Sequence, residues 1–243
     1  GKIGNYILDG QMNLRPDGDD RAWNWLQENA AIPSREGTLE VDEASVIYTD
    51  DAGRRYRIPK NPAFVTPGPL GCGRLCREVA TERDLFNCHG TFYELPANNA
   101  GGFARIRPVT THNLRIFDYC SYRGLLVISG INLAAAGDNR HVIESDDGKA
   151  ALWVGAVDDV WELGKPVGAG GPWLDTEVEA KEASDPYLLT GYDRKSLLLE
   201  ADRATTITAE IDISGMGDWH VWKTWPVAAG ASVEETFPDA FQA

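Results

Sequence analysis

The sequence predicts an all-β protein in which propeller-like blades are followed by a β-sandwich-like C-terminal module. Three observations carry this prediction: a segment that repeats itself, a series of short alternating strands between turns, and the composition. The chain has eight tryptophans, eight tyrosines and 25 glycines, but only two methionines. Aromatic residues and turn glycines in this proportion are typical of strands joined by tight turns.

The repeat is clearest in the middle of the chain. Arg77-Glu-Val-Ala-Thr81 recurs 30 residues later as Arg107-Pro-Val-Thr-Thr111, and Gly90 and Gly124, each of which opens an apolar run, lie 34 residues apart. Each copy joins a polar stretch bearing His or Arg to a short strand. A period of this size is typical of radially repeated β-sheets, so we expect blades.

Three hairpins are expected around and within the repeats, at residues 46–58, 91–107 and 141–154. The first and third contain the turn sequences Asp50-Asp-Ala-Gly53 and Asp146-Asp-Gly148 between alternating segments. Short runs of β-branched and aromatic residues on both sides of such turns predict antiparallel pairs. One pattern repeated three times favours successive blades or parts of blades.

These features divide the chain into three parts. Residues 1–37 are predicted to be an irregular N-terminal segment, with one short helix at 21–28 capped by Asp19 or Asp20. Residues 38–163 form the propeller-like β-repeat region, and residues 164–243 form a linker and the β-sandwich-like module. Four alternating segments predict the strands of this module, at 196–200, 205–213, 219–225 and 232–237.

Charge and hydropathy exclude several classes of partner. The 23 Lys and Arg residues against 37 Asp and Glu give a net charge of −14, whereas nucleic acid needs a concentrated basic face. No apolar run is long enough to span a bilayer, and residues 1–5 lack the apolar region of a signal peptide. Phosphate-loop and dinucleotide-binding motifs are missing, and no cofactor is predicted.

The four cysteines are Cys72, Cys76, Cys88 and Cys120. Their spacing lacks the paired knuckles of a zinc site, and we predict no metal. Free thiols are favoured over a disulfide because Cys88 and Cys120 occupy similar places in the two copies of the repeat.

Three stretches carry a family resemblance. They are Asn87-Cys-His-Gly-Thr-Phe-Tyr-Glu-Leu-Pro96, residues 107–126, and the tail with Gly170-Gly-Pro-Trp173 and residues 185–193. This region, roughly 75–243, resembles the C-terminal portion of large uncharacterised bacterial proteins, which are themselves similar to sugar-acting β-propellers such as polysaccharide lyases and rhamnosidases. The resemblance implies a secreted or periplasmic protein that acts on a polysaccharide or oligosaccharide. The resemblance also implies that, compared with those longer proteins, most N-terminal blades and a final strand are missing here.

The repeats also supply candidate site residues. Between residues 95 and 135, four arginines accompany a single acid, Asp118. Guanidinium groups match carboxylates in bidentate fashion, so an anionic glycan is the expected substrate. For β-elimination, His89 or His112 would remove a proton and Tyr93 or Tyr122 would protonate the leaving oxygen. The residues expected to bind the substrate are Arg107, Arg115 and Arg123.

Other interpretations stay open at this stage. Each histidine is also suited to fixing a blade turn through a backbone carbonyl, and the arginines to pairing with acids elsewhere. Glycoside hydrolysis would need two carboxylates, for which Glu82, Glu94, Asp118 and the pair Asp158-Asp159 are candidates. The alternative function is a non-catalytic glycan-binding or structural β protein that associates with itself or with a missing chain portion, because an unclosed propeller exposes strand edges.

Overall fold

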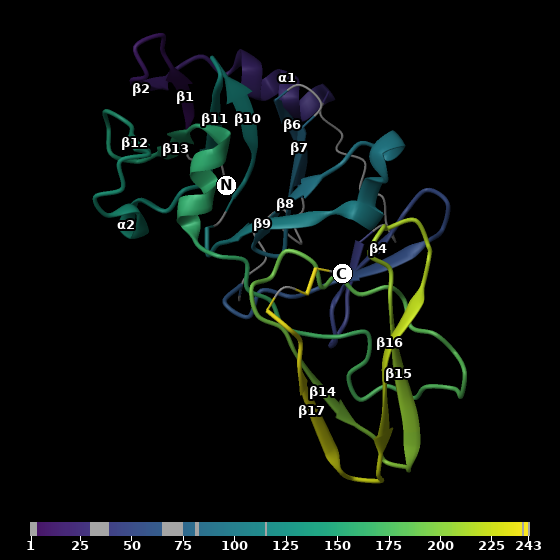
Figure 1. Ribbon diagram of the computed structural model, residues 1–243. Coiled ribbons are helices and arrows are strands. Elements are labelled where there is room, and N and C mark those ends of the chain that lie inside the picture. The colour runs from purple at the N-terminus through teal and green to yellow at the C-terminus, as the bar shows by residue number, and fades with distance from the viewer. Residues whose placement is uncertain are drawn as a thin grey trace.

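The computed structural model describes residues 4–29, 39–64, 75–80, 83–114, 116–239 and 241–242. The chain is mostly β, as predicted, and its strands form several small antiparallel sheets with no closed ring of blades among the described residues (Figure 1). In chain order the first strands are β1 (Asn5–Leu8), β2 (Leu14–Asp17), β3 (Leu39–Val41), β4 (Val46–Thr49), β5 (Arg55–Ile58), β6 (Leu75–Ala80), β7 (Arg83–Cys88), β8 (Thr91–Leu95) and β9 (Arg107–Thr111). They are followed by β10 (Tyr119–Tyr122), β11 (Leu125–Ser129), β12 (Val142–Glu144), β13 (Ala151–Gly155), β14 (Ser196–Glu200), β15 (Thr205–Ile211), β16 (His220–Val227) and β17 (Ser232–Thr236).

Helices are short and few. The α-helices are α1 (Arg21–Asn29) and α2 (Leu133–Ala136), and the 3-10 helices are η1 (Asn98–Ala100), η2 (Gly102–Arg105) and η3 (Val157–Leu163). The predicted N-terminal helix is confirmed as α1, and the Asp19 carboxylate accepts a hydrogen bond from the Arg21 amide at its start. The N-terminal segment is more regular than predicted, because β1 and β2 form a hairpin ahead of this helix.

The four-stranded sheet β6-β7-β8-β9 lies at the centre of the body and has both faces covered. Alternate residues point to opposite faces, so Leu85 and Phe92 join one hydrophobic core while Phe86 and Tyr93 join another. The first core is shared with the sheet β10-β11-β13-β12, and the second with the sheet β3-β4-β5. Three sheets therefore stack face to face in chain order.

The 34-residue repeat corresponds to two equivalent hairpins. His89-Gly90 joins β7 to β8 and Arg123-Gly124 joins β10 to β11, with φ of 48° and 76° in the first turn and 53° and 81° in the second. Two consecutive positive φ values define a type I′ turn, whose twist matches that of the paired strands. Glycine at the second position accommodates this geometry without steric cost.

Two expectations drawn from the repeat are wrong in detail. The 30-residue spacing of the Arg-x-Val segments is not a blade period, because Arg77 lies on β6 and Arg107 on β9, the two edges of one sheet. The turn glycines instead align Cys88 with Tyr122, so Cys88 and Cys120 are not equivalent. The hairpin expected at 91–107 is also different, because residues 102–105 form η2 rather than a strand, and β8 pairs with β9 instead. The hairpins predicted at 46–58 and 141–154 are confirmed.

The segment after η3 runs along the β3–β5 sheet. The backbone groups of Ala169 and Lys60 exchange two hydrogen bonds. The Arg57 amide donates to the Pro186 carbonyl, and the Leu188 amide donates to the Arg57 carbonyl. The Arg57 side chain adds ion pairs with Asp42 and Asp185, at 2.7 and 3.1 Å. The segment is thus fastened to the body at two places, near Ala169 and near Leu188.

The four strands predicted for the C-terminal module are confirmed, and they form two two-stranded sheets, β14–β17 and β15–β16. This C-terminal arm projects away from the stacked sheets (Figure 1). A small core of Leu199, Trp225 and Val227 holds it together. The register shifts beside Ala209 and leaves Trp222 as an extra residue, and this bulge brings the Trp222 ring within 5.7 Å of Trp225 despite their odd spacing.

A buried amide joins the sheets at one end. The side chain of Asn61 is 3% exposed, and its Nδ2 donates to the carbonyl oxygens of Gly90 and His112 at 3.1 and 2.9 Å. Its Oδ1 accepts from the Ala63 amide at 2.8 Å. Asn61 therefore ties the chain after β5 to the β7–β8 turn and to the end of β9.

Replacing Asn61 tests this connection. We expect Asn61→Ala to lower the free energy of unfolding by about 2 kcal/mol or more, because two buried carbonyl oxygens lose their donor. Urea unfolding followed by tryptophan fluorescence measures the change. The control is Asn99→Ala, at an exposed position in η1. Equal stability of the two variants would contradict the role given to Asn61.

Candidate functional site

The structure brings His89 and His112 to the same end of the central sheet. His89 lies in the β7–β8 turn, His112 directly follows β9, and the His112 amide donates to the Gly90 carbonyl at 2.8 Å. Their rings have different surroundings: the His89 ring contacts Phe64 at 5.0 Å between centroids, and the His112 ring contacts Phe92 at 4.8 Å.

His112 is enclosed in the protein interior. The residue is 5% exposed, its Nε2 lies 2.9 Å from Asn87 Oδ1, and its Nδ1 accepts from the Leu114 amide at 3.1 Å. These partners require a neutral ring with its proton on Nε2. Burial lowers the pKa of His112 to about 4. Both ring nitrogens are occupied, so this geometry supports the structural interpretation of His112.

His89 is half-buried, and its Nδ1 has no hydrogen-bond partner among the described residues. Burial lowers its pKa, and the nearby charge of Lys60 lowers it further. The ring is therefore neutral near pH 7. Its left-handed backbone conformation is that required at the first position of the type I′ turn.

The two predicted proton donors lie in different environments. Tyr93 is fully buried in the core between β3–β5 and β6–β9, and burial raises its pKa well above the usual value. Tyr122 ends β10 and is only partly buried. A substrate in solvent cannot reach the Tyr93 hydroxyl without displacing core side chains.

The predicted arginines belong to separate sheets. Arg107 is exposed at the start of β9, whereas Arg123 Nη1 donates to the Gly10 carbonyl at 2.6 Å and so connects the β10–β11 turn to the N-terminal hairpin. Arg115 lies outside the described residues. The structure therefore shows no anion site shared by Arg107 and Arg123.

Cys76 and Cys120 are free thiols, as favoured from the sequence, but both are exposed. Cys88 is buried, and Cys72 lies outside the described residues. Within the described ranges, no three His, Cys, Asp or Glu side chains are grouped to hold a metal ion. No helix in the described part of the chain is long and apolar enough to cross a membrane.

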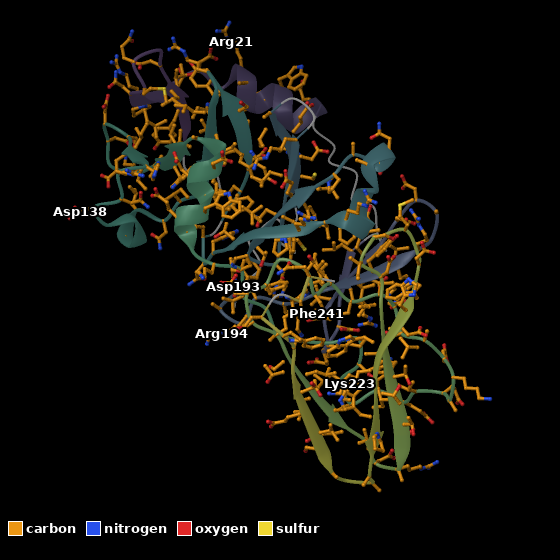
Figure 2. The ribbon with its side chains drawn as sticks, viewed as in Figure 1. Arg21, Asp138, Asp193, Arg194, Lys223 and Phe241 are labelled. Carbon is orange, nitrogen blue, oxygen red and sulfur yellow. The ribbon has the colours of Figure 1, made fainter. Side chains whose placement is uncertain are left out.

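A different cluster of side chains forms a cavity of about 390 Å³ where the start of β12 meets β13 and η3. We call it the His141 hollow. Its lining consists of Asp138, Asn139, Arg140, His141, Trp153, Asp159, Glu162 and Leu163. These residues come from the segment between α2 and β12, from β13 and from η3. Figure 2 shows Asp138 at this side of the molecule, away from Lys223 on the C-terminal arm.

The backbone around the hollow is fixed by local hydrogen bonds. Asn139 Oδ1 accepts from the His141 amide at 2.9 Å, and the Val154 amide donates to the His141 carbonyl at 2.7 Å. Asp159 Oδ2 accepts from the Ala156 amide at 2.7 Å and thereby caps η3. A Cβ at Gly155 would lie within 2.9 Å of both His141 and Asp159, so these two side chains can meet only over a glycine.

His141 is the central side chain of the hollow. Its ring stacks on Trp153 with centroids 4.8 Å apart, Nδ1 lies 3.1 Å from the Val154 carbonyl, and Nε2 accepts from Arg140 Nε at 3.2 Å. These contacts describe a neutral ring with its proton on Nδ1. The Asp159 and Glu162 carboxylates lie beside opposite ring nitrogens, at 3.9 and 3.4 Å.

Asp159 is among the carboxylate candidates that the sequence offers, whereas His141 is predicted from the sequence only as the start of a strand. The signal that could have drawn attention to it is the dense run Asp138-Asn-Arg-His141, four polar residues ahead of an apolar strand. Its convergence with η3 depends on the pairing of β12 with β13, which sequence spacing does not reveal.

Comparisons with protein-family models, with curated proteins and with solved structures found no match to this chain.

The buried His112 predicts a specific pH dependence of stability. Because its pKa in the folded protein, about 4, lies below the ordinary 6.5, the unfolded chain takes up a proton first as the pH falls. Stability present above pH 6.5 should therefore decline down to about pH 4, by about 3 kcal/mol from this residue.

Urea unfolding at pH 7 and near pH 4.5 tests this expectation. The stability difference between the two pH values should be smaller in His112→Gln than in the wild type, and unchanged in the control His220→Gln, whose side chain is exposed. A His112→Gln variant with the full wild-type pH dependence would contradict the role of the neutral buried ring.

Proposed function

We propose that this protein binds a glycan, and that the His141 hollow is its binding site. The observation that carries the proposal is the composition of the hollow: hydrogen-bonding side chains converge beside the stacked His141 and Trp153 rings and Leu163. A sugar presents hydroxyl groups around its edge and C–H groups on its faces, and a pocket with a few placed polar groups and an apolar wall complements both. The volume of about 390 Å³ lies within the range of small-ligand sites.

Binding is better supported than cleavage by β-elimination. Of the proposed proton acceptors, His112 has both nitrogens occupied, and of the proposed donors, Tyr93 is fully buried. The other two candidates, His89 and Tyr122, belong to different sheets. Glycoside hydrolysis would instead use carboxylates, and Asp159 and Glu162 flank the hollow, but each already has a role, as the cap of η3 and as the partner of Arg140. An assay for sugar release accompanies the binding test below.

The stacked sheets support a propeller-like arrangement as part of the same proposal. Sheets of three, four and four strands follow one another in chain order, and equivalent type I′ hairpins recur at a spacing of 34 residues. Sugar-acting proteins with such an arrangement work on glycans outside the cytoplasm, so a secreted or periplasmic location belongs to the proposal. The expected partner is a polysaccharide or oligosaccharide.

A glycan array followed by calorimetry on any ligand found tests the proposal. We expect Glu162→Ala to weaken binding at least tenfold, because Glu162 lines the hollow and holds Arg140 at 2.6 Å. The matched control is Glu144→Ala, an exposed carboxylate on β12 outside the hollow. Equal binding by both variants, or binding to no glycan, would overturn the proposal, and sugar release by the wild type would extend it to hydrolysis.

A second candidate function, structural self-association, is favoured by the C-terminal arm. Large apolar side chains are exposed there, with Leu198 at 58% and Val221 at 64%, and the loop between β15 and β16 exposes Ile213 at 72% and Met216 at 69%. Among the described residues, each sheet of the arm has only two strands and so two unpaired edges. Such edges and patches are typical of surfaces that pair with another chain.

Sedimentation velocity over a wide concentration range tests self-association. A concentration-dependent dimer or larger species is expected, and Val221→Lys should shift it toward the monomer, because a buried lysine at an interface loses its hydration. Val178→Lys, an exposed site on the linker, serves as the control. A monomer at every concentration excludes this function and leaves glycan binding unaffected.

A further inference from the structure

The charge around the His141 hollow limits which glycan it can take. Three carboxylates line it, those of Asp138, Asp159 and Glu162, against one cation, Arg140. Arg140 Nη2 donates to Glu162 Oε1 at 2.6 Å and Arg140 Nε donates to His141 Nε2 at 3.2 Å. The positive charge is therefore already neutralised by a partner inside the site, and the remaining charge is negative.

The carboxylate oxygens of the lining offer hydrogen-bond acceptors, beside the donors of Asn139 and Arg140. Within the described part of the chain, no cation pairs with Asp138, which is exposed at the rim. Asp159 uses one oxygen, Oδ2, to cap η3, and Glu162 Oε2 faces His141 at 3.4 Å. The carboxylate oxygens left over need donors, and an ammonium group offers three donors and a positive charge.

A uronic acid carries a carboxylate, which has the same charge as the carboxylates that line the hollow. Its carboxylate needs donors, but the guanidinium that could supply them is paired with Glu162, and Asp138 would repel it. The net charge of −14 on the whole chain adds to this repulsion. The anionic glycan expected from the arginines of the repeats therefore does not suit this site.

We propose that the His141 hollow recognises an amino sugar whose amine is free and protonated, with Asp138 and Glu162 facing the ammonium group and the His141 ring, which covers the buried Trp153, lying beside the sugar. This inference rests on the proposed glycan-binding function and names its substrate class. Both carboxylates lie on the rim of the hollow, where a charged ligand keeps part of its hydration, so the selectivity depends on ionic strength.

Calorimetric titration of the full chain with four probes tests the proposal. The probes are short oligomers of glucosamine, the matching oligomers of N-acetylglucosamine, oligogalacturonate and spermidine. Glucosamine oligomers should bind at least tenfold more tightly than the N-acetylated oligomers, and oligogalacturonate should not bind. Raising the salt concentration, or raising the pH above the pKa of the ligand amine, should reduce this preference.

A variant that removes one carboxylate charge tests which residue gives the preference for glucosamine oligomers. Asp138→Asn keeps the shape of the side chain and should lower the preference for glucosamine over N-acetylglucosamine oligomers about tenfold. The matched control is Asp218→Asn, which makes the same charge change at an exposed position beyond the hollow, between β15 and β16. An unchanged preference in Asp138→Asn would overturn the assignment of the ammonium group to Asp138.

The outcomes separate this inference from the proposed function. Equal or tighter binding of N-acetylated or uronate oligomers in a Glu162-dependent manner would overturn the amino-sugar assignment and keep glycan binding. Spermidine binding without any sugar binding would overturn both, because the hollow would then be a site for amines alone. Absence of binding to all four probes would likewise overturn the amino-sugar assignment.

Discussion

The burial of the β6–β9 sheet on both faces is the constraint on which the rest of the structure depends. A sheet enclosed between two cores has little solvent to satisfy its polar groups, so a partner inside the protein stabilises them. Asn61 donates to the Gly90 and His112 carbonyls, His112 pairs with Asn87, and Thr110 donates to the Gly164 carbonyl at 2.6 Å. These bonds fasten the neighbouring segments to the central sheet.

The same constraint favours the structural interpretation of His112. The side chains best suited to proton transfer by residue type, His112 and Tyr93, lie where substrate cannot reach them, and their pKa values move away from neutrality because burial opposes charge. The proposed glycan site lies instead at the β10–β13 sheet. There His141 rests on Trp153 and retains contact with solvent through the rim of the hollow.

The C-terminal arm is stabilised differently from the stacked sheets. Two-stranded sheets are marginal by themselves, and the arm is held by the packing of Trp222 and Trp225 with Phe237 and by hydrogen bonds to the body. Arg105 Nε, in η2, donates to the Ser214 carbonyl at 2.8 Å, and the Asp212 carboxylate accepts from the amides of the loop that carries Ser214. These hydrogen bonds fix the backbone of the loop and therefore the positions of its exposed apolar side chains.

Periodicity and turn chemistry, both local properties, determined much of the fold from the sequence alone. The all-β class, helix α1, the hairpins at 46–58 and 141–154 and the four C-terminal strands follow from alternation and from Asp- and Gly-rich turns. Only the tertiary structure decided that Arg77 and Arg107 lie at two edges of one sheet, that Trp222 is a bulge, and that His112 is enclosed. Likewise, His141, Asp159 and Glu162 meet only because β12 pairs with β13 and Gly155 leaves room between them. Strand partners and burial are set by contacts between distant residues, whereas sequence patterns report on near neighbours.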